Sequence, residues 1–114
     1  MSRRFPKTRN DGSFAVRVRF SAAPEKGVAT VQSWLSEWVR ENGEWVFMGE
    51  VRHFGEYFRE APEASLGAAG ELCIVFRGLS ADRRFWKDWY VRIGRATQEA
   101  FPEVGKLVAV DNND

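Results

Sequence analysis

The chain has 114 residues, of which 44% are hydrophobic and 29% charged, and its net charge is +1. These values are typical of one globular domain and exclude a chain that is disordered throughout. The single cysteine, Cys73, excludes an internal disulfide. No apolar run reaches the roughly 20 residues of a membrane span, and no apolar stretch follows the basic start as in a secretory signal. We therefore expect a cytoplasmic protein.

The chain begins with a polar, basic segment that is followed by a strand. Residues 1–12 contain Pro6 and Gly12 and no apolar periodicity, which predicts a flexible arm. Apolar side chains then alternate with other residues at Phe14, Val16, Val18 and Phe20. This period of two predicts a strand with one buried face, and Ala15, Arg17 and Arg19 on the other face.

The next segment predicts a helix. Apolar residues recur at helical spacing at Val28, Val31, Leu35 and Trp38. Pro24 suits the first turn of such a helix, and Gly43 suits its end, where glycine often takes a left-handed conformation. Asn42-Gly43 is also a frequent hairpin turn, but the helical pattern before it favours a helix terminus.

The middle of the chain has weaker patterns. Residues 44–54 are rich in tryptophan, valine and phenylalanine and predict a second strand, in which Gly49 marks a bulge or a close backbone contact. Residues 55–70 predict a long irregular loop, with at most a helical turn within it.

The last third of the chain predicts a strand, a helix and a short strand. Residues 71–77 have apolar side chains on both faces, which indicates a central strand or a sheet face that is covered. Ser80 is a good N-cap for a helix that Pro102 ends, and residues 106–111 predict the last strand. The helical period is carried by Trp86, Trp89, Tyr90, Ile93, Ala96, Thr97 and Ala100.

The order strand, helix, strand, strand, helix, strand predicts the fold. It resembles small ferredoxin-like domains, so we expect an α+β β-α-β-β-α-β sandwich with two helices on one face of a four-stranded antiparallel sheet. Residues 13–111 form the expected domain, between the arm at 1–12 and a frayed tail at 112–114. The resemblance is one of element order alone and implies no functional residue.

The sequence has no recognisable catalytic group, metal site or cofactor site. His53 is the single histidine, and Cys73 lies in the middle of a predicted strand, where an inert packing role is expected. Closely spaced glycines do not open a helix, and paired metal ligands are missing. We therefore expect neither catalytic residues nor a cofactor, and a binding protein is favoured over an enzyme.

Charge and aromatic residues suggest where a partner binds. Residues 1–20 carry an excess of basic side chains, whereas residues 21–78 carry an excess of acidic ones. The face of the sheet without helices is expected to show an apolar strip of Ala15, Cys73 and Val75, to which Val46 and Met48 contribute. With the 55–70 loop, this face would bind a partner protein, as in an inhibitor or immunity-type module. The predicted binding residues are Arg17, Arg19, Tyr57, Phe58, Arg59, Arg77, Arg84 and Phe85.

Two other functions fit the sequence less well. A dimeric ferredoxin-like domain could bind or convert a small molecule at Trp45, His53 and Trp89. Nucleic acid could bind the basic arm, but the sheet face offers no aromatic residue on which bases could stack, so this function is disfavoured.

Overall fold

The computed structural model describes residues 13–56, 58, 61–79 and 86–112 of the chain. In chain order, its elements are β1 (Ser13–Phe20), α1 (Val28–Asn42), β2 (Glu44–Phe47), β3 (Glu50–His53), the short 3₁₀-helix η1 (Phe54–Glu56), β4 (Glu63–Leu66), β5 (Leu72–Leu79), α2 (Trp86–Ala100), a second 3₁₀-helix η3 (Pro102–Val104) and β6 (Leu107–Asn112). The arm at 1–12, the Ser80 N-cap and residues 113–114 lie outside the described residues, and β6 extends one residue into the expected tail.

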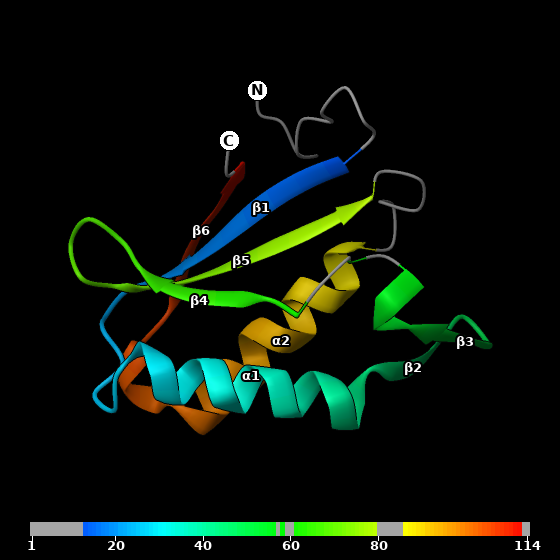
Figure 1. Ribbon diagram of the computed structural model, residues 1–114, viewed down its shortest axis with the longest axis horizontal. Helices are drawn as coiled ribbons and strands as arrows, with labels where there is room; N and C mark the ends of the chain where they lie inside the picture. Colours follow the sequence, from blue (N-terminus) through cyan, green and yellow to red (C-terminus); the bar gives the residue numbers. More distant parts are fainter. Residues whose placement is uncertain (1–12, 57, 59–60, 80–85, 113–114) are drawn as a thin grey trace.

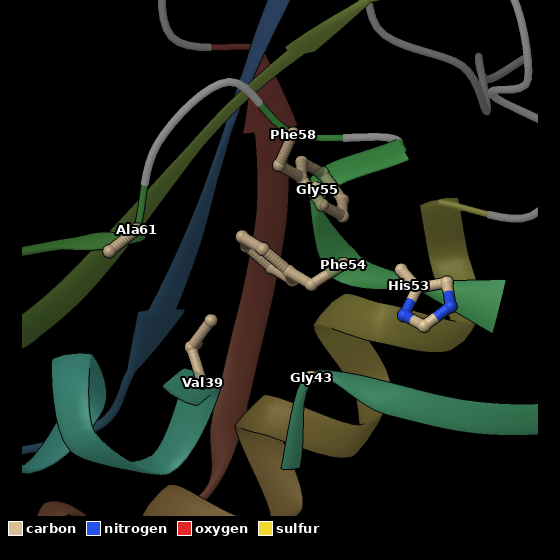
Figure 2. Close-up of a pocket in the computed structure, with 7 residues that line it drawn as sticks. All are labelled: Val39, Gly43, His53, Phe54, Gly55, Phe58 and Ala61. Carbon is tan, nitrogen blue, oxygen red and sulfur yellow. The ribbon is translucent and has the colours of Figure 1, made fainter. Parts of the chain in front are cut away.

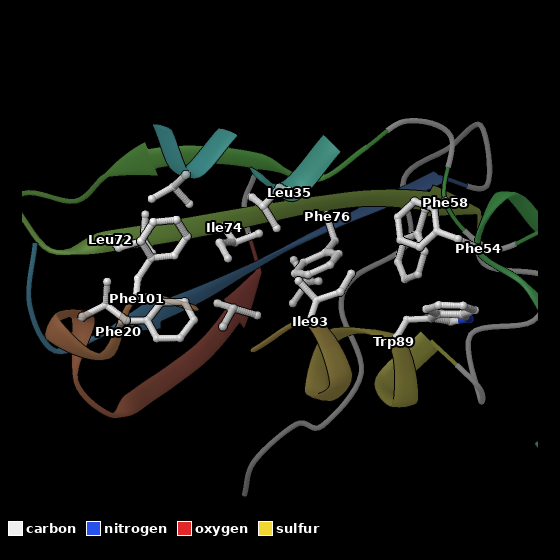
Figure 3. Packing of buried hydrophobic residues seen from close by; sticks show 14 residues of the cluster. Phe20, Leu35, Phe54, Phe58, Leu72, Ile74, Phe76, Trp89, Ile93 and Phe101 are labelled. Carbon is white, nitrogen blue, oxygen red and sulfur yellow. The ribbon is translucent and has the colours of Figure 1, made fainter. Parts of the chain in front are cut away.

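Four strands form one antiparallel sheet in the order β4-β5-β1-β6, and both helices lie on one face of it (Figure 1). Alternate residues of β1 and β5 point into the layer between sheet and helices, where they meet the apolar stripes of α1 and α2. Figure 3 shows this core, with Phe20, Leu72 and Phe101 toward one end and Phe54, Phe58 and Trp89 toward the other. The expected α+β architecture, with its four-stranded sheet, is confirmed.

The strongest periodic patterns in the sequence correspond to the elements observed. The strands predicted at 14–20, 71–77 and 106–111 are β1, β5 and β6, and β5 is central, as its two apolar faces indicated. Both helices are present, although α1 begins at Val28 rather than near Pro24, because Gly27 before it has a φ of 90° that no helix allows.

The prediction of one strand over residues 44–54 is wrong. This segment is a separate two-stranded hairpin, β2–β3, which projects beyond the end of α1 (Figure 1). Met48 and Gly49 have φ values of 53° and 81°, so the chain reverses there in a turn with two left-handed residues, a geometry that favours hairpins. The fourth strand of the main sheet is instead β4, which lies inside the segment predicted as a loop.

Gly43 ends α1, but not in the left-handed conformation that was expected. Its φ is −75°, and a side-chain Cβ at this position would come within 2.6 Å of the Val39 carbonyl oxygen. Glycine is thus required by a close backbone approach, which lets the chain leave α1 directly into β2. The Phe54 amide, which donates to the Gly43 carbonyl oxygen at 2.8 Å, closes the base of the hairpin.

The exposed edge of β4 is held by a side chain of α1. The Gln32 amide donates from Nε2 to the Pro62 carbonyl oxygen at 3.0 Å and accepts at Oε1 from the Ala64 amide at 2.7 Å. One glutamine thereby satisfies two backbone groups, as a neighbouring strand would. This contact explains how a four-residue strand without a clear sequence pattern is placed at the sheet edge.

The turn between β4 and β5 is organised by Glu71. Its carboxylate accepts from the Ala69 amide at 3.0 Å and lies 3.6 Å from Arg19, and a Cβ at Gly67 would overlap it. Hydrogen bonds from backbone amides and the nearby Arg19 charge hold the pKa of Glu71 below its ordinary value of 4.5.

Because the folded state lowers this pKa, ionised Glu71 stabilises the fold above pH 4.5, and that contribution is lost as the pH falls through the lowered value. Glu71→Gln is therefore expected to lower the urea midpoint at pH 7 and to have a much smaller effect at pH 3. Glu99→Gln, an exposed change on α2, is the matched control. An equal loss at both pH values for Glu71→Gln would contradict the assignment.

Candidate functional site

The sheet face opposite the helices does not carry the apolar strip that was expected. Ala15, Cys73 and Val75 are all buried, and Val46 and Met48 belong to the separate hairpin. Each of the three buried residues lies directly opposite an arginine across the β1–β5 ladder: Ala15 with Arg77, Val75 with Arg17, and Cys73 with Arg19. Arginine stems cover neighbouring small side chains, so this face is closed by polar residues.

Two of the predicted binding residues on this face have partners within the chain. Arg77 Nη1 lies 2.9 Å from Glu63 Oε1, and Arg19 Nη1 lies 3.6 Å from Glu71 Oε2. Arg17 is half-buried between the same strands. A phosphate or carboxylate of a ligand would have to compete with Glu63 and Glu71 for these guanidinium groups.

Of the remaining predicted binding residues, Phe58 is the one that the structure describes. Phe58 is buried, stacks on Phe54 at a centroid distance of 4.7 Å and packs on Phe76, so it is a core residue and the expectation of a surface contact is wrong. Four further binding residues lie outside the described part of the chain: Tyr57, Arg59, Arg84 and Phe85.

The hairpin β2–β3 presents the exposed apolar surface that the helix-free face of β1 and β5 lacks. Val46 and Val51 face each other across the ladder and are 61% and 52% exposed, and Met48 in the turn is 81% exposed. The next pair on the same face is Glu44 with His53, whose side chains are exposed and 3.9 Å apart. We call these five residues the hairpin strip.

The opposite face of the hairpin is fixed to the helices through an arginine among tryptophans. The Arg92 guanidinium of α2 lies over Trp38, Trp45 and Trp89 at 5.2, 4.3 and 5.0 Å from the ring centroids. Trp45 also meets Trp89 edge to face at 5.7 Å. Cation–π contacts of a desolvated guanidinium contribute about 2 kcal/mol, so this cluster holds the hairpin against the body.

Arg92 remains charged although it is partly removed from water. Burial lowers its pKa from the ordinary value, but arginine keeps its proton at neutral pH. Among the described residues, its Nη1 atom is buried and has no hydrogen-bond partner. Ring faces therefore replace a carboxylate as the environment of this charge.

An open pocket of about 310 Å³ lies at the base of the hairpin (Figure 2). Figure 2 shows the rings of Phe54 and Phe58 in its centre, with Val39 and Ala61 on one side and the His53 imidazole on the other. His53 belongs to both the pocket and the hairpin strip, which makes them one continuous surface. In the described part of the chain, no three histidine, cysteine, aspartate or glutamate side chains are placed to hold a metal ion.

The three residues proposed for a small-molecule site lie in one region but do not line one cavity. Trp45 and Trp89 pack on each other, and Trp89 is 1% exposed, so it supports the hairpin rather than contacting a ligand. Of these three residues, only His53 lines the pocket at the base of the hairpin.

The hairpin strip was missed in the sequence, where Met48-Gly49 was the available signal for a turn. None of the described helices is long and apolar enough to cross a membrane. No protein-family model matches the chain, and neither the curated proteins nor the solved structures contain a significant match.

Proposed function

We propose that this protein is a small protein-interaction module, of the inhibitor or immunity type, that binds its partner through the hairpin strip and the pocket beside it. The observation that carries the proposal is the exposed Val46–Val51 pair with Met48 beyond it. Contiguous exposed apolar surface is uncommon on monomeric proteins and marks binding sites.

The geometry of the turn supports a role for Met48. Its φ of 53° places a long apolar side chain in a conformation that glycine or asparagine adopts more easily. Methionine is a flexible side chain that adapts to partner surfaces. A strained and 81% exposed methionine is difficult to explain by folding alone, because glycine at this position would relieve the strain.

The charges around the strip indicate the chemistry of the partner. Glu50 pairs with Arg52 on the hairpin and Glu37 with Arg40 on α1, and the exposed Glu41 and Glu44 leave an excess of negative charge. A partner that presents an apolar group beside lysine or arginine would be complementary to this surface. Nucleic acid and anionic membranes would be repelled by the same carboxylates.

Affinity capture from native lysate with three matched variants tests the proposal. Val46→Thr combined with Val51→Thr keeps strand propensity, Met48→Gly removes the exposed side chain, and Arg77→Gln alters the sheet face. We expect the first two to reduce recovery of a stoichiometric partner about tenfold, as losing roughly 1.4 kcal/mol requires, and the third to leave it unchanged.

The control for folding is that none of the three variants melts below the temperature of the wild type; Met48→Gly can melt above it, because glycine relieves the strain. Equal recovery of the partner by the wild type and by both hairpin variants would reject the hairpin as the binding surface. Loss of the partner in Arg77→Gln alone would place the partner-binding site on the sheet face.

A second candidate function is supported by the pocket. Its volume of about 310 Å³ and its apolar lining around His53 suit a small ligand, either in the monomer or in a dimeric ferredoxin-like domain. A ligand that binds the native state alone raises the melting temperature. We would expect His53→Ala to remove such a rise found in a metabolite screen, and a screen without any rise would count against this candidate.

We infer that the fold is of the ferredoxin-like type with an inserted hairpin. The sheet order β4-β5-β1-β6 supports this assignment if β4 and β5 serve as the second and third strands of the motif and β6 as the fourth. The hairpin β2–β3 would then be an addition between the first helix and the second strand, and additions of this kind often carry function.

A further inference from the structure

The two edges of the main sheet differ in how their backbone groups are satisfied. At β4, the Gln32 side chain binds the Pro62 carbonyl and the Ala64 amide. At the other edge, β6 pairs with β1, and no other described strand lies beside it. Every second residue of an edge strand directs its amide and carbonyl away from the sheet, so β6 can accept a further strand.

The exposed edge of β6 is apolar rather than charged. Leu107 is 40% exposed and Val108 53% exposed, and Val110 follows them. Arg19 pairs with Ala109 and Phe20 with Leu107, so Val108 is the extra residue of a bulge in β6, and the pairing is regular from Ala109 to Asn112. Natural sheets usually protect such an edge with lysine, proline, a bulge or a covering segment, and the bulge in β6 lies at its start, before the regular ladder of Ala109 to Asn112.

A groove accompanies this edge on the helix side of the sheet. It has a volume of about 250 Å³ and lies between α2 and the start of β6, lined by Tyr90, Val91, Gly94, Arg95, Gln98 and Leu107. Gly94 has no side chain and lies against Leu107, which opens the groove between helix and strand. An added strand would place alternate side chains into it.

Arg95 supplies a charge at the rim of the groove. Its side chain is exposed on α2, next to the apolar floor formed by Val91 and Leu107. A strand with a carboxylate near this position would be complementary to it. The hairpin strip, by contrast, is bordered by more glutamates than arginines, so the two surfaces favour ligands of opposite charge.

We propose that the β6 edge and the α2–β6 groove form a second docking site, which binds an extended acidic peptide segment by strand addition. Backbone hydrogen bonds to β6 hold the peptide, apolar side chains at alternate positions enter the groove, and a carboxylate pairs with Arg95. This site is independent of the hairpin strip.

The first probe is a fluorescent eight-residue peptide that alternates valine and threonine and ends in glutamate. Two further versions carry N-methyl groups on alternate residues, one set along each edge of the peptide. Strand addition uses one edge only, so one methylated version is expected to bind like the parent peptide and the other to lose binding. Equal binding, or equal loss, for both methylated versions would overturn the proposal.

Variants of the protein locate the site. Val108→Lys protects the edge, and Arg95→Glu reverses the rim charge; each is expected to weaken binding at least about fivefold, with an unchanged melting temperature. Met48→Gly on the hairpin is the control that leaves binding unchanged. Wild-type affinity in both the edge variant and the groove variant would overturn the proposal. A homodimer that Val108→Lys dissociates would also overturn it, because a second copy would then occupy the edge.

Discussion

Replacing Trp89 with alanine is expected to lower the free energy of unfolding by about 3–5 kcal/mol, the usual range for removing a buried tryptophan. The side chain is 1% exposed and joins three parts of the molecule: Phe54 packs on it edge to face at 5.5 Å, Trp45 at 5.7 Å, and Arg92 lies over its ring. Since small domains are stable by about 5–15 kcal/mol, this one change removes much of the total. Urea unfolding followed by circular dichroism measures it.

Val91→Ala is the matched control, on the same helix at a position that is 38% exposed. We expect it to change stability by no more than about 0.5 kcal/mol, because exposed substitutions seldom do more. A loss below about 1 kcal/mol for Trp89→Ala would show that the core at the hairpin end contributes little, contrary to the packing in Figure 3.

Arg92→Ala is expected to lower the free energy of unfolding by about 2–3 kcal/mol, because it removes both the cation–π contacts and the packing of the long side chain. The guanidinium lies within 5.2 Å of three ring centroids, and two of these rings, Trp38 and Trp45, connect α1 and the hairpin to α2. Hydrogen exchange should become faster in β2 and β3 than in β1 and β5, which identifies the hairpin as the part released.

Arg92→Met separates packing from charge. Methionine fills a similar volume against aromatic rings and ends the desolvation of a charged group, so we expect a loss of under about 1 kcal/mol. If Arg92→Met were as destabilising as Arg92→Ala, the charge rather than the packing would hold the hairpin.

Regular apolar periodicity in this sequence predicted strands and helices that are present in the structure. The alternation from Phe14 to Phe20 predicted β1, and the apolar residues on both sides of residues 71–77 predicted a central strand. The helical spacing around Leu35 and Ile93 predicted two helices that cover one sheet face. These predictions succeeded because burial of one face imposes its period directly on the sequence.

The segment between α1 and β5 could not be predicted in the same way. Residues 63–66, and not residues 44–54, supply the fourth strand of the main sheet, and this choice depends on long-range contacts. Gln32 pairs with the backbone of β4, and Arg92 stacks on Trp45 in the hairpin. Neither contact leaves a periodic pattern in the local sequence. The left-handed Met48 also departs from the usual residues of such a turn.

The candidate binding sites show the same difference between local pattern and long-range contact. Composition and spacing by themselves determined one α+β domain with an acidic middle section and no catalytic motif, because these properties follow from residue types and local periods. Tertiary structure alone decided which apolar residues are exposed. Cross-strand arginines cover Ala15, Cys73 and Val75. Val46, Met48 and Val51 are exposed instead, on a hairpin whose other face is held by Arg92. The reason is that cross-strand pairing and layer packing are not encoded in any single segment.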